Sequence, residues 1–190
     1  MGPWSGETPL KHSPGMMKLP NLLKFLPDKF VIFLCTCGPV GTWGRAPGTN
    51  GTVLGLVLYT LLYFRLPMLL QLMLTAILVV IAIVVCGEGE RRMQKNDPGE
   101  MILDEVVAIP LCFLAMEPLW AQTGHVWIYM VAGFILFRVF DILKPLGISR
   151  LQKYPGGLGV VIDDLAAALA TNITIRLFYL AYMQGGWENL

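Results

Sequence analysis

Charged residues are scarce in this chain of 190 amino acids. Only 14% are charged, whereas 55% are hydrophobic, and the mean hydropathy is +0.63. A soluble domain of ordinary composition carries roughly 25% charged residues. This deficit excludes a soluble globular enzyme, a disordered tail and a collagen-like chain, and it indicates a membrane protein.

The chain also lacks a strong charge of one sign and the usual metal-binding patterns. Its formal net charge is +1, so no clustered basic surface for nucleic acid is expected. Four cysteines, Cys35, Cys37, Cys86 and Cys112, form no C-x-x-C pair and suggest neither a zinc site nor a disulfide framework. With two histidines and no D-x-D motif, phosphatase mechanisms based on a Cys or His nucleophile are disfavoured.

Long apolar runs predict an all-α, multi-pass helical bundle. Residues 66–86 contain about enough apolar residues to cross a bilayer, and 53–65 pair with them as a helical hairpin that is either spanning or re-entrant. A second hairpin is expected from 102–121 and 126–142, followed by a long C-terminal helix at 160–183. The short run 29–37 suits an interfacial or buried helix. Residues 1–24 are expected to be a mobile cytoplasmic arm without a signal peptide, and 25–190 a single membrane domain.

Two hairpins place the loops 38–52, 87–101 and 143–159 on one face. That face carries most of the basic residues, while the opposite face offers only Arg65. Because basic residues are retained on the cytoplasmic side, we expect this face to be cytoplasmic. The basic residues of its loops are Arg45, Arg91, Arg92, Lys95, Lys144, Arg150 and Lys153.

Acidic residues gather in the second of these loops and the helix that follows it. Asp97, Glu100 and Asp104 recur at offsets of three and four, with Glu105 adjacent. Such carboxylates would repel one another unless a cation or basic groups neutralised them. Oxygen ligands without His or thiolate favour Mg²⁺, which is also bound through substrate phosphates and water.

The first loop is rich in glycine and hydroxyl groups. Residues 37–55 include Thr49, Gly51 and Thr52 and open a helix, so the loop could cradle a phosphate with its N–H groups. Alternatively it is a turn followed by a Gly51-x-x-x-Gly55 packing face, since no Walker-type lysine is present.

The third loop joins cations to further acids. Arg138, Asp141 and Lys144 recur every three residues on one helical face, and Asp163 and Asp164 open the last helix. The groups could form a functional site or a structural ion-pair network. Two deeper charges, Glu117 and Arg176, each about 20 Å further along their helices, are expected to pair structurally.

At these segments the sequence resembles the phosphatidylglycerophosphatase A family. The strings that carry the resemblance are APGTNGTVLG at 46–55, NDPGEMILDEVV at 96–107, FILFRVFDILKP at 134–145 and GGLGVVIDDLAAALA at 156–170. The resemblance covers about residues 25–180. It implies a Mg²⁺-dependent lipid phosphatase of the bacterial cytoplasmic membrane that converts phosphatidylglycerophosphate to phosphatidylglycerol and inorganic phosphate. The acidic motif positions are Asp97, Glu100, Asp104, Glu105, Asp141, Asp163 and Asp164.

On this interpretation the active face is cytoplasmic and the lipid stays in the membrane. Asp97, Glu100, Asp104 and Asp164, or Asp163 in its place, are expected to hold Mg²⁺. Arg138, Lys144 and the loop with Thr49, Gly51 and Thr52 are expected to bind phosphate, and Asp141 to orient Arg138. Which acid among Asp104, Glu105, Asp141, Asp163 and Asp164 is ligand, base or nucleophile stays open, as does the oligomeric state. The alternative function is a small cation or proton transporter that uses intramembrane acids.

Overall fold

The computed structural model describes residues 23 and 25–184, and within them the chain is helical without strands. The predicted arm, residues 1–24, lies outside the described residues except for Leu23. Seven α-helices and three short segments of other helical type follow one another: α1 (Asp28–Cys35), η1 (Val40–Thr42), α2 (Pro47–Leu58), η2 (Tyr59–Tyr63), α3 (Met68–Met93), α4 (Leu103–Cys112), α5 (Glu117–Thr123), α6 (Val126–Leu143), η3 (Pro145–Lys153) and α7 (Gly157–Gln184). The prediction of an all-α bundle is confirmed.

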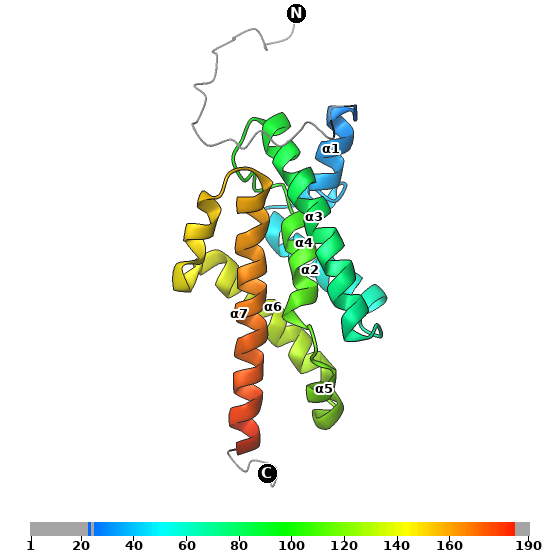
Figure 1. The fold of residues 1–190 in the computed structure, drawn as a ribbon, viewed down its shortest axis with the longest axis vertical. Helices are drawn as coiled ribbons and strands as arrows, with labels where there is room; N and C mark the ends of the chain where they lie inside the picture. Colours follow the sequence, from blue (N-terminus) through cyan, green and yellow to red (C-terminus); the bar gives the residue numbers. More distant parts are fainter. Residues whose placement is uncertain (1–22, 24, 185–190) are drawn as a thin grey trace, which may run out of the picture.

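Three of the described helices, α3, α6 and α7, are long and apolar enough to cross a membrane. At about 1.5 Å per residue, the 26 residues of α3 span about 39 Å and the 28 residues of α7 about 42 Å. The helices α3 and α7 run lengthwise through the molecule, and α7 ends at the opposite end from α1 (Figure 1). The predicted segments 66–86, 126–142 and 160–183 are therefore confirmed as helices.

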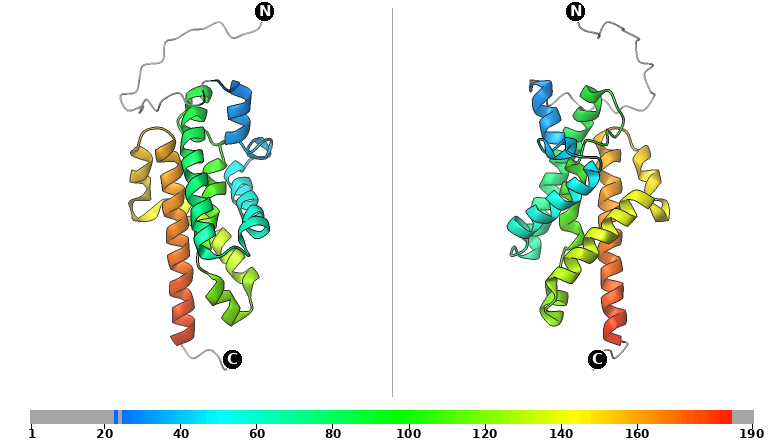
Figure 2. Two further views of the ribbon diagram at one scale, coloured as in Figure 1. Left: turned by 45° about the vertical axis from the view of Figure 1, so that its right-hand side comes forward. Right: turned by 180° about the vertical axis from the view of Figure 1, so that it is seen from behind.

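The helix α4 forms the centre of the bundle. It packs against α2, α3 and α7, and α6 lies obliquely across α7 (Figure 2). Most side chains of α4 are buried, among them Val107, Ala108, Ile109 and Cys112. Because α4 begins at the end of the bundle where the loops meet, its acidic first turn is enclosed by its neighbours.

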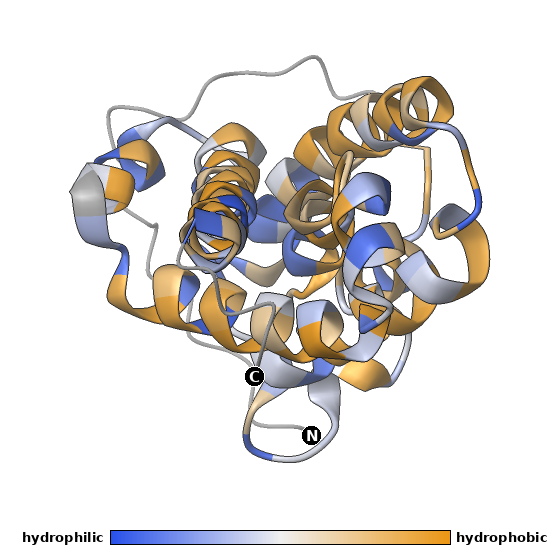
Figure 3. Cartoon of the chain, turned by 90° about the horizontal axis from the view of Figure 1, so that it is seen from below, coloured by the Kyte–Doolittle hydropathy of each residue, from blue (hydrophilic) through white to orange (hydrophobic). Residues whose placement is uncertain are grey.

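Outward-facing side chains of the long helices are apolar. On α3 the exposed residues include Leu69, Ile77 and Val80, and on α7 Ile173 and Leu177. Viewed along the bundle, hydrophobic segments cover much of its outside, and hydrophilic segments lie between the central helices (Figure 3). Exposed apolar surface on spanning helices is suited to lipid contact, because lipid, unlike water, imposes no cost on it.

The predicted hairpin arm 102–121 is helical, but it is bent and divides into two helices. The helices α4 and α5 meet at an angle of 61°. Pro110 lies inside α4 and removes a backbone donor, Ala115 takes a left-handed conformation with φ +56°, and Pro118 follows in the first turn of α5. Together these residues end one helix and start another.

Carbonyl groups freed by this break are satisfied from α7. The Asn172 amide donates hydrogen bonds to the carbonyls of Leu111, Cys112 and Leu114 at 3.0–3.2 Å. The Arg176 guanidinium donates to the carbonyls of Leu114 and Ala115 at 2.9 and 2.7 Å. Irregular backbone at membrane depth requires such partners.

The expected pairing of the two deep charges was therefore wrong. Arg176 is engaged by the freed carbonyls and by Asn172, and Glu117 accepts a 2.9 Å hydrogen bond from the Gln71 amide of α3. Arg176 is thus held by the break between α4 and α5, and Glu117 is held by α3.

The three motif loops meet at one end of the bundle, as predicted. The Ile102 N–H donates to the Cys35 carbonyl at 3.0 Å, Gly41 lies against the Glu100 carbonyl, and the Gln152 amide donates to Asp97 at 3.2 Å. The short run 29–37 forms helix α1 at this same end.

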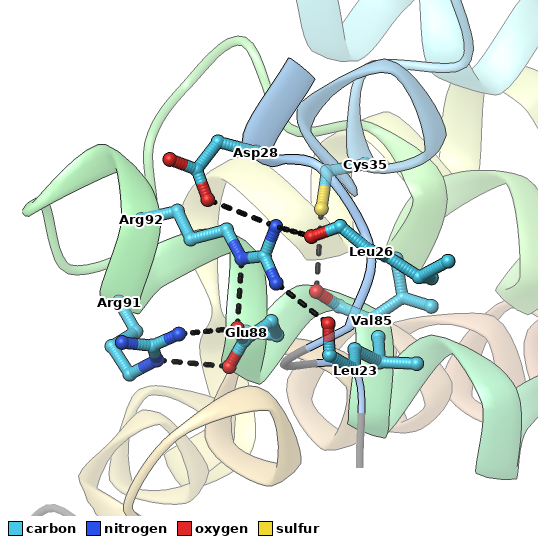
Figure 4. Close-up of polar contacts among 8 residues, drawn as sticks. All are labelled: Leu23, Leu26, Asp28, Cys35, Val85, Glu88, Arg91 and Arg92. Atoms are coloured by element: carbon cyan, nitrogen blue, oxygen red, sulfur yellow. Dashed lines mark hydrogen bonds and ion pairs between the residues drawn. The ribbon is translucent and has the colours of Figure 1, made fainter. Parts of the chain in front are cut away.

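A buried arginine fastens the chain before α1 to the end of α3. Arg92, only 4% exposed, donates to the carbonyls of Leu23 and Leu26 at 2.7 and 2.8 Å and pairs with Asp28 and Glu88 (Figure 4). Arg91 donates to both oxygens of Glu88, at 2.5 Å to Oε1, which Arg92 also contacts, and at 2.9 Å to Oε2. These contacts fix α1 beside the loop that follows α3.

Candidate functional site

Three carboxylates meet where α4 and α7 begin. Asp104 and Glu105 lie in the first turn of α4 and Asp164 in the second turn of α7, and oxygen atoms of all three lie within 4.8 Å of one another. Their residues are 5%, 9% and 4% exposed. Gly157, the first residue of α7, lets this helix lie directly against α3, because a Cβ there would collide with the Ile83 carbonyl and Gly87.

This acidic cluster (Asp104, Glu105 and Asp164) fits a hard cation. Asp104 Oδ1 and Glu105 Oε2 are buried without a hydrogen-bond partner among the described residues. Buried anionic oxygens without partners are costly, and like charges at this distance raise the cost further. Hard divalent cations such as Mg²⁺ prefer carboxylate oxygens as ligands.

Arg138 of α6 borders the acidic cluster. Its Nη1 donates to Asp141 Oδ2 at 2.7 Å and lies 3.4 Å from Glu105 Oε1. Asp141 follows Arg138 by about one helical turn, so the pair comes from a single helical face. The sequence prediction that Asp141 orients Arg138 agrees with this geometry. The Arg138 Nε is also buried, with no partner in the described part of the chain.

Lys144 brings a second cation to the site from the end of α6. It adopts a left-handed conformation with φ +44°, which is uncommon for a residue with a side chain, and its ammonium donates a hydrogen bond to Asp163 Oδ2. Burial acts to lower the pKa of Lys144, but the bond to Asp163 and the nearby acids outweigh it and raise that pKa above its usual value. Lys144 therefore stays charged, and Asp163 keeps a second buried oxygen, Oδ1, without a partner among the described residues.

The start of α2 packs directly on Glu105 and Arg138. A Cβ at Gly48 would meet both side chains, and one at Gly51 would lie 2.7 Å from Glu105 Oε2. Residues 47–52, expected to be a loop, are helical because Pro47 suits the first turn of a helix. Thr49 is half-buried in this turn, whereas Thr52 is buried and its hydroxyl donates to the Gly48 carbonyl at 2.9 Å.

Two of the predicted metal ligands lie apart from the acidic cluster. Asp97 is in the exposed loop before α4, where its N–H donates to Glu90 Oε1 at 2.8 Å and its carboxylate accepts from Gln152. Partial loss of water raises the pKa of Asp97, Lys144 opposes this, and the charge of Asp141 adds to it. Glu100 is half-buried and lies 3.7 Å from Lys95. Their role as ligands stays a prediction.

Sequence reasoning missed several residues that shape the site. Glu90 and Gln152 hold the Asp97 loop, and the Asn50 amide donates to the carbonyls of Val40 and Trp43 at 3.2 and 2.6 Å, which fixes η1 beside α2. The only sequence signal was position, because all three lie in or beside the motif loops. Their partners are seven to 55 residues away, which no local pattern reveals.

The fold and the site together define a membrane-embedded helical protein with a buried acidic cluster flanked by Arg138 and Lys144. The family model described as phosphatidylglycerophosphatase A matches residues 33–179. The chain belongs to this family. All the residues of the acidic cluster and both cations fall within the match.

Relatives among known proteins are consistent with this family. A phosphatidylglycerophosphatase A from Haemophilus influenzae is 33% identical over 131 residues, which cover 68% of this chain and 77% of the relative. A phosphatidylglycerophosphatase A from Escherichia coli is 28% identical over 86 residues, covering 45% of this chain and 46% of the relative.

A third relative carries a different name. A protein from Bacteroides thetaiotaomicron, provisionally named phosphatidylinositol-3-phosphatase, is 36% identical over 81 residues, which cover 43% of this chain and 48% of the relative. The matched part thus spans about half the length of two of the three relatives. No solved structure matches the chain significantly.

Proposed function

We propose that this protein hydrolyses the phosphomonoester of phosphatidylglycerophosphate to phosphatidylglycerol and inorganic phosphate. Family membership and the names of two relatives support the substrate. The observation that carries the reaction type is the acidic cluster with Arg138 3.4 Å from Glu105. Carboxylates that can hold a cation beside a fixed guanidinium are suited to phosphoryl chemistry.

Asp104, Glu105 and Asp164 would hold Mg²⁺, with Asp97 and Glu100 at the edge of the site. When bound, the ion supplies positive charge to phosphate oxygens and lowers the pKa of a coordinated water. The unpartnered oxygens of Asp104 and Glu105 support this assignment. The chain offers no His or thiolate in the acidic cluster, which favours Mg²⁺ over zinc.

Arg138, Lys144 and the first turn of α2 bind the phosphate in this proposal. Arg138 has a buried Nε without a described partner and can donate it to a phosphoryl oxygen while Asp141 holds Nη1. The start of α2 adds N–H groups that no side chain caps, at a helix end that favours anions. Thr49 is the hydroxyl best placed to join them, because Thr52 already donates to Gly48.

In this proposal Asp163 takes the proton of the attacking water. The Lys144 ammonium donates to Asp163 Oδ2, and the buried Asp163 Oδ1 is left to accept a proton. The water oxygen forms a bond to phosphorus, the bond from phosphorus to the glycerol oxygen breaks, and the leaving oxygen receives the proton that Asp163 took from the water. The lipid product and inorganic phosphate then carry all the atoms of substrate and water.

We infer a cytoplasmic orientation for the site, in the inner membrane of a bacterium. Its end of the bundle carries Arg91, Lys95, Arg150 and Lys153, whereas Arg65 lies at the turn between η2 and α3. This distribution follows the tendency of basic residues to stay inside. Acyl chains remain beside the apolar helices while the phosphate reaches the acidic cluster.

The transporter alternative receives less support. Its key acids should lie at membrane depth, facing a pathway. Glu117, the deep acid, accepts a hydrogen bond from Gln71, and Arg176 is engaged by backbone carbonyls. The remaining acids of the site cluster at one end.

Phosphate release from phosphatidylglycerophosphate by the purified, detergent-solubilised protein tests the proposal. We expect release with Mg²⁺, none with a chelator, and a decrease of about 100-fold or more in Asp104→Asn and Asp164→Asn. A phosphatidylinositol 3-phosphate arm tests the activity in the name of the Bacteroides relative. Near-normal release by both variants would refute the site, and release from the inositol lipid alone would refute the substrate.

A further inference from the structure

Asp97 is held in an unusual conformation by residues from two other elements. Its φ is +45°, and Gln94, which ends α3, has φ +53°. Left-handed backbone is uncommon outside glycine, but aspartate adopts it more readily than most residues, and a left-handed residue commonly ends a helix. The position of Asp97 in the loop between α3 and α4 is therefore best judged from its hydrogen bonds.

The first restraint comes from Glu90, in the last turn of α3. Its Oε1 accepts the Asp97 N–H at 2.8 Å, and its own carbonyl accepts the Lys95 N–H at 3.3 Å. These two bonds fold the loop back over the end of α3. The carboxylate of Glu90 thus acts on the backbone of Asp97 and leaves the Asp97 side chain free for another partner.

The second restraint comes from Gln152 in η3. Its amide Nε2 donates to Asp97 Oδ2 at 3.2 Å across 55 residues of sequence. The η3 segment begins directly after Lys144 and ends shortly before α7, which carries Asp163 and Asp164. Gln152 therefore connects Asp97 to η3, the segment that joins Lys144 to the start of α7.

Electrostatics alone would not keep the Asp97 carboxylate at this place. Lys144 attracts it, but Asp141, Asp163 and Asp104 carry the same charge and act against it. The loop is exposed, so water offers Asp97 an alternative environment. Two hydrogen bonds oppose this repulsion: the Glu90 carboxylate accepts the Asp97 N–H, and the neutral Gln152 amide donates to Oδ2. The Glu90 carboxylate adds to the negative charge around Asp97, so it acts on the Asp97 backbone and the amide acts on its side chain. The Asp97 carboxylate has lone pairs left for a cation.

We propose that Glu90 and Gln152 are positioning residues that hold Asp97 at the mouth of the acidic cluster, ready to bind a divalent cation. The inference rests on the proposed function in that Mg²⁺ is taken as the cation. Neither residue touches the cluster itself, so their effect passes through Asp97.

The experiment compares Glu90→Ala, Gln152→Ala and the conservative Glu90→Gln in the full-length purified protein. We measure the Mg²⁺ concentration that gives half of the maximal Mg²⁺-induced increase in Tm, and the Mg²⁺ concentration for half-maximal phosphate release. We expect both concentrations to rise about 10-fold in the two alanine variants, at the lower end of the roughly 10- to 100-fold loss of affinity that follows when residues supporting metal ligands are removed. Release at saturating Mg²⁺ should stay close to that of the unsubstituted protein.

Glu90→Gln should behave like the unsubstituted protein, because its amide oxygen still accepts the Asp97 N–H. Gln122→Ala is the matched control, since it removes a glutamine that accepts a hydrogen bond from Tyr179 at the other end of the bundle. Unchanged Mg²⁺ midpoints in both alanine variants, or an equal change in Gln122→Ala, would overturn the positioning roles. Absence of any Mg²⁺ effect on the unsubstituted protein would overturn both this inference and the Mg²⁺ dependence of the proposed function.

Discussion

Arg138 and Asp141 form a 2.7 Å hydrogen bond within one turn of α6, and the same guanidinium nitrogen reaches Glu105 of α4 at 3.4 Å. One planar group therefore links the helix that carries the cations to the helix that carries the acids. A lysine ammonium cannot reproduce this planar geometry.

Arg138→Lys should accordingly reduce kcat/KM for phosphatidylglycerophosphate by about 10- to 100-fold. Asp141→Asn should have a smaller effect, mainly on KM, because the guanidinium remains but is less firmly oriented. Steady-state phosphate release measures both. Arg150→Lys, at an exposed position of η3, is the control and should match the unsubstituted protein. An Arg138→Lys variant with unchanged kcat/KM would show that Arg138 does not bind the phosphate.

Gly51 is required by the close approach of α2 to α4. In Gly51→Ala the added Cβ would lie 2.7 Å from Glu105 Oε2 and 2.9 Å from Ile102 Cβ, so either the carboxylate or the helix must move. We expect a loss of about 1–3 kcal/mol in the free energy of unfolding, as for other overpacked sites. Denaturation in detergent measures it. Gly99→Ala should be nearly neutral, since nothing lies within 4 Å of its added Cβ; an equal loss in both variants would contradict the packing argument.

The ion pair of Lys144 and Asp163 predicts a dependence of stability on alkaline pH. Because the folded protein raises the pKa of Lys144 above 10.5, the pair contributes fully below that pH and is lost as the pH rises through the raised pKa. The difference in Tm between the unsubstituted protein and Lys144→Met should therefore be constant near neutral pH and shrink above about pH 10.5. A difference that stays constant to higher pH would show that Lys144 stabilises by packing alone.

Asn172 should be among the most sensitive positions far from the acidic cluster. Asn172→Ala removes donors from the carbonyls of Leu111, Cys112 and Leu114 at the break between α4 and α5. Leaving buried acceptors unsatisfied costs about 1–3 kcal/mol, measured as a loss in unfolding free energy. Thr174→Ala is the control, because Thr174 bonds only within its own helix turn, to the Ala170 carbonyl. Equal stability of the two variants would mean that the break does not depend on Asn172.

Much of the fold follows from the sequence, because long apolar runs leave few alternatives to spanning helices. The exception is the apolar run 102–121. It is long enough for one span, but it divides into α4, which contains Pro110, and α5, which begins with Glu117 and Pro118. Hydropathy is insensitive to such a break, because residues 113–116, which join the two helices, are themselves apolar. The partners that make the break tolerable, Asn172 and Arg176, come from a helix some 60 residues later.

The sequence predicted which acidic residues lie at the site, but not which of them cluster together. Asp104, Glu105 and Asp164 converge because α4 and α7 start side by side, which the loop topology indicated. Spacing along the sequence suggested that Asp97 and Glu100 belong with Asp104, but only Asp104 is part of the acidic cluster, and Asp97, with its left-handed backbone, lies in the exposed loop at the edge of the site. Backbone conformation at single residues is not encoded in a periodic pattern.

The depth of the acidic cluster sets the dielectric environment of the site. Asp163 and Asp164 are the seventh and eighth residues of α7, so they lie about 10 Å along the helix from its first residue. Asp104, Glu105 and Asp164 are at most 9% exposed. A given pair of charges interacts several times more strongly in such surroundings than in bulk water. Burial thereby strengthens every charge contact that the site makes with a phosphate.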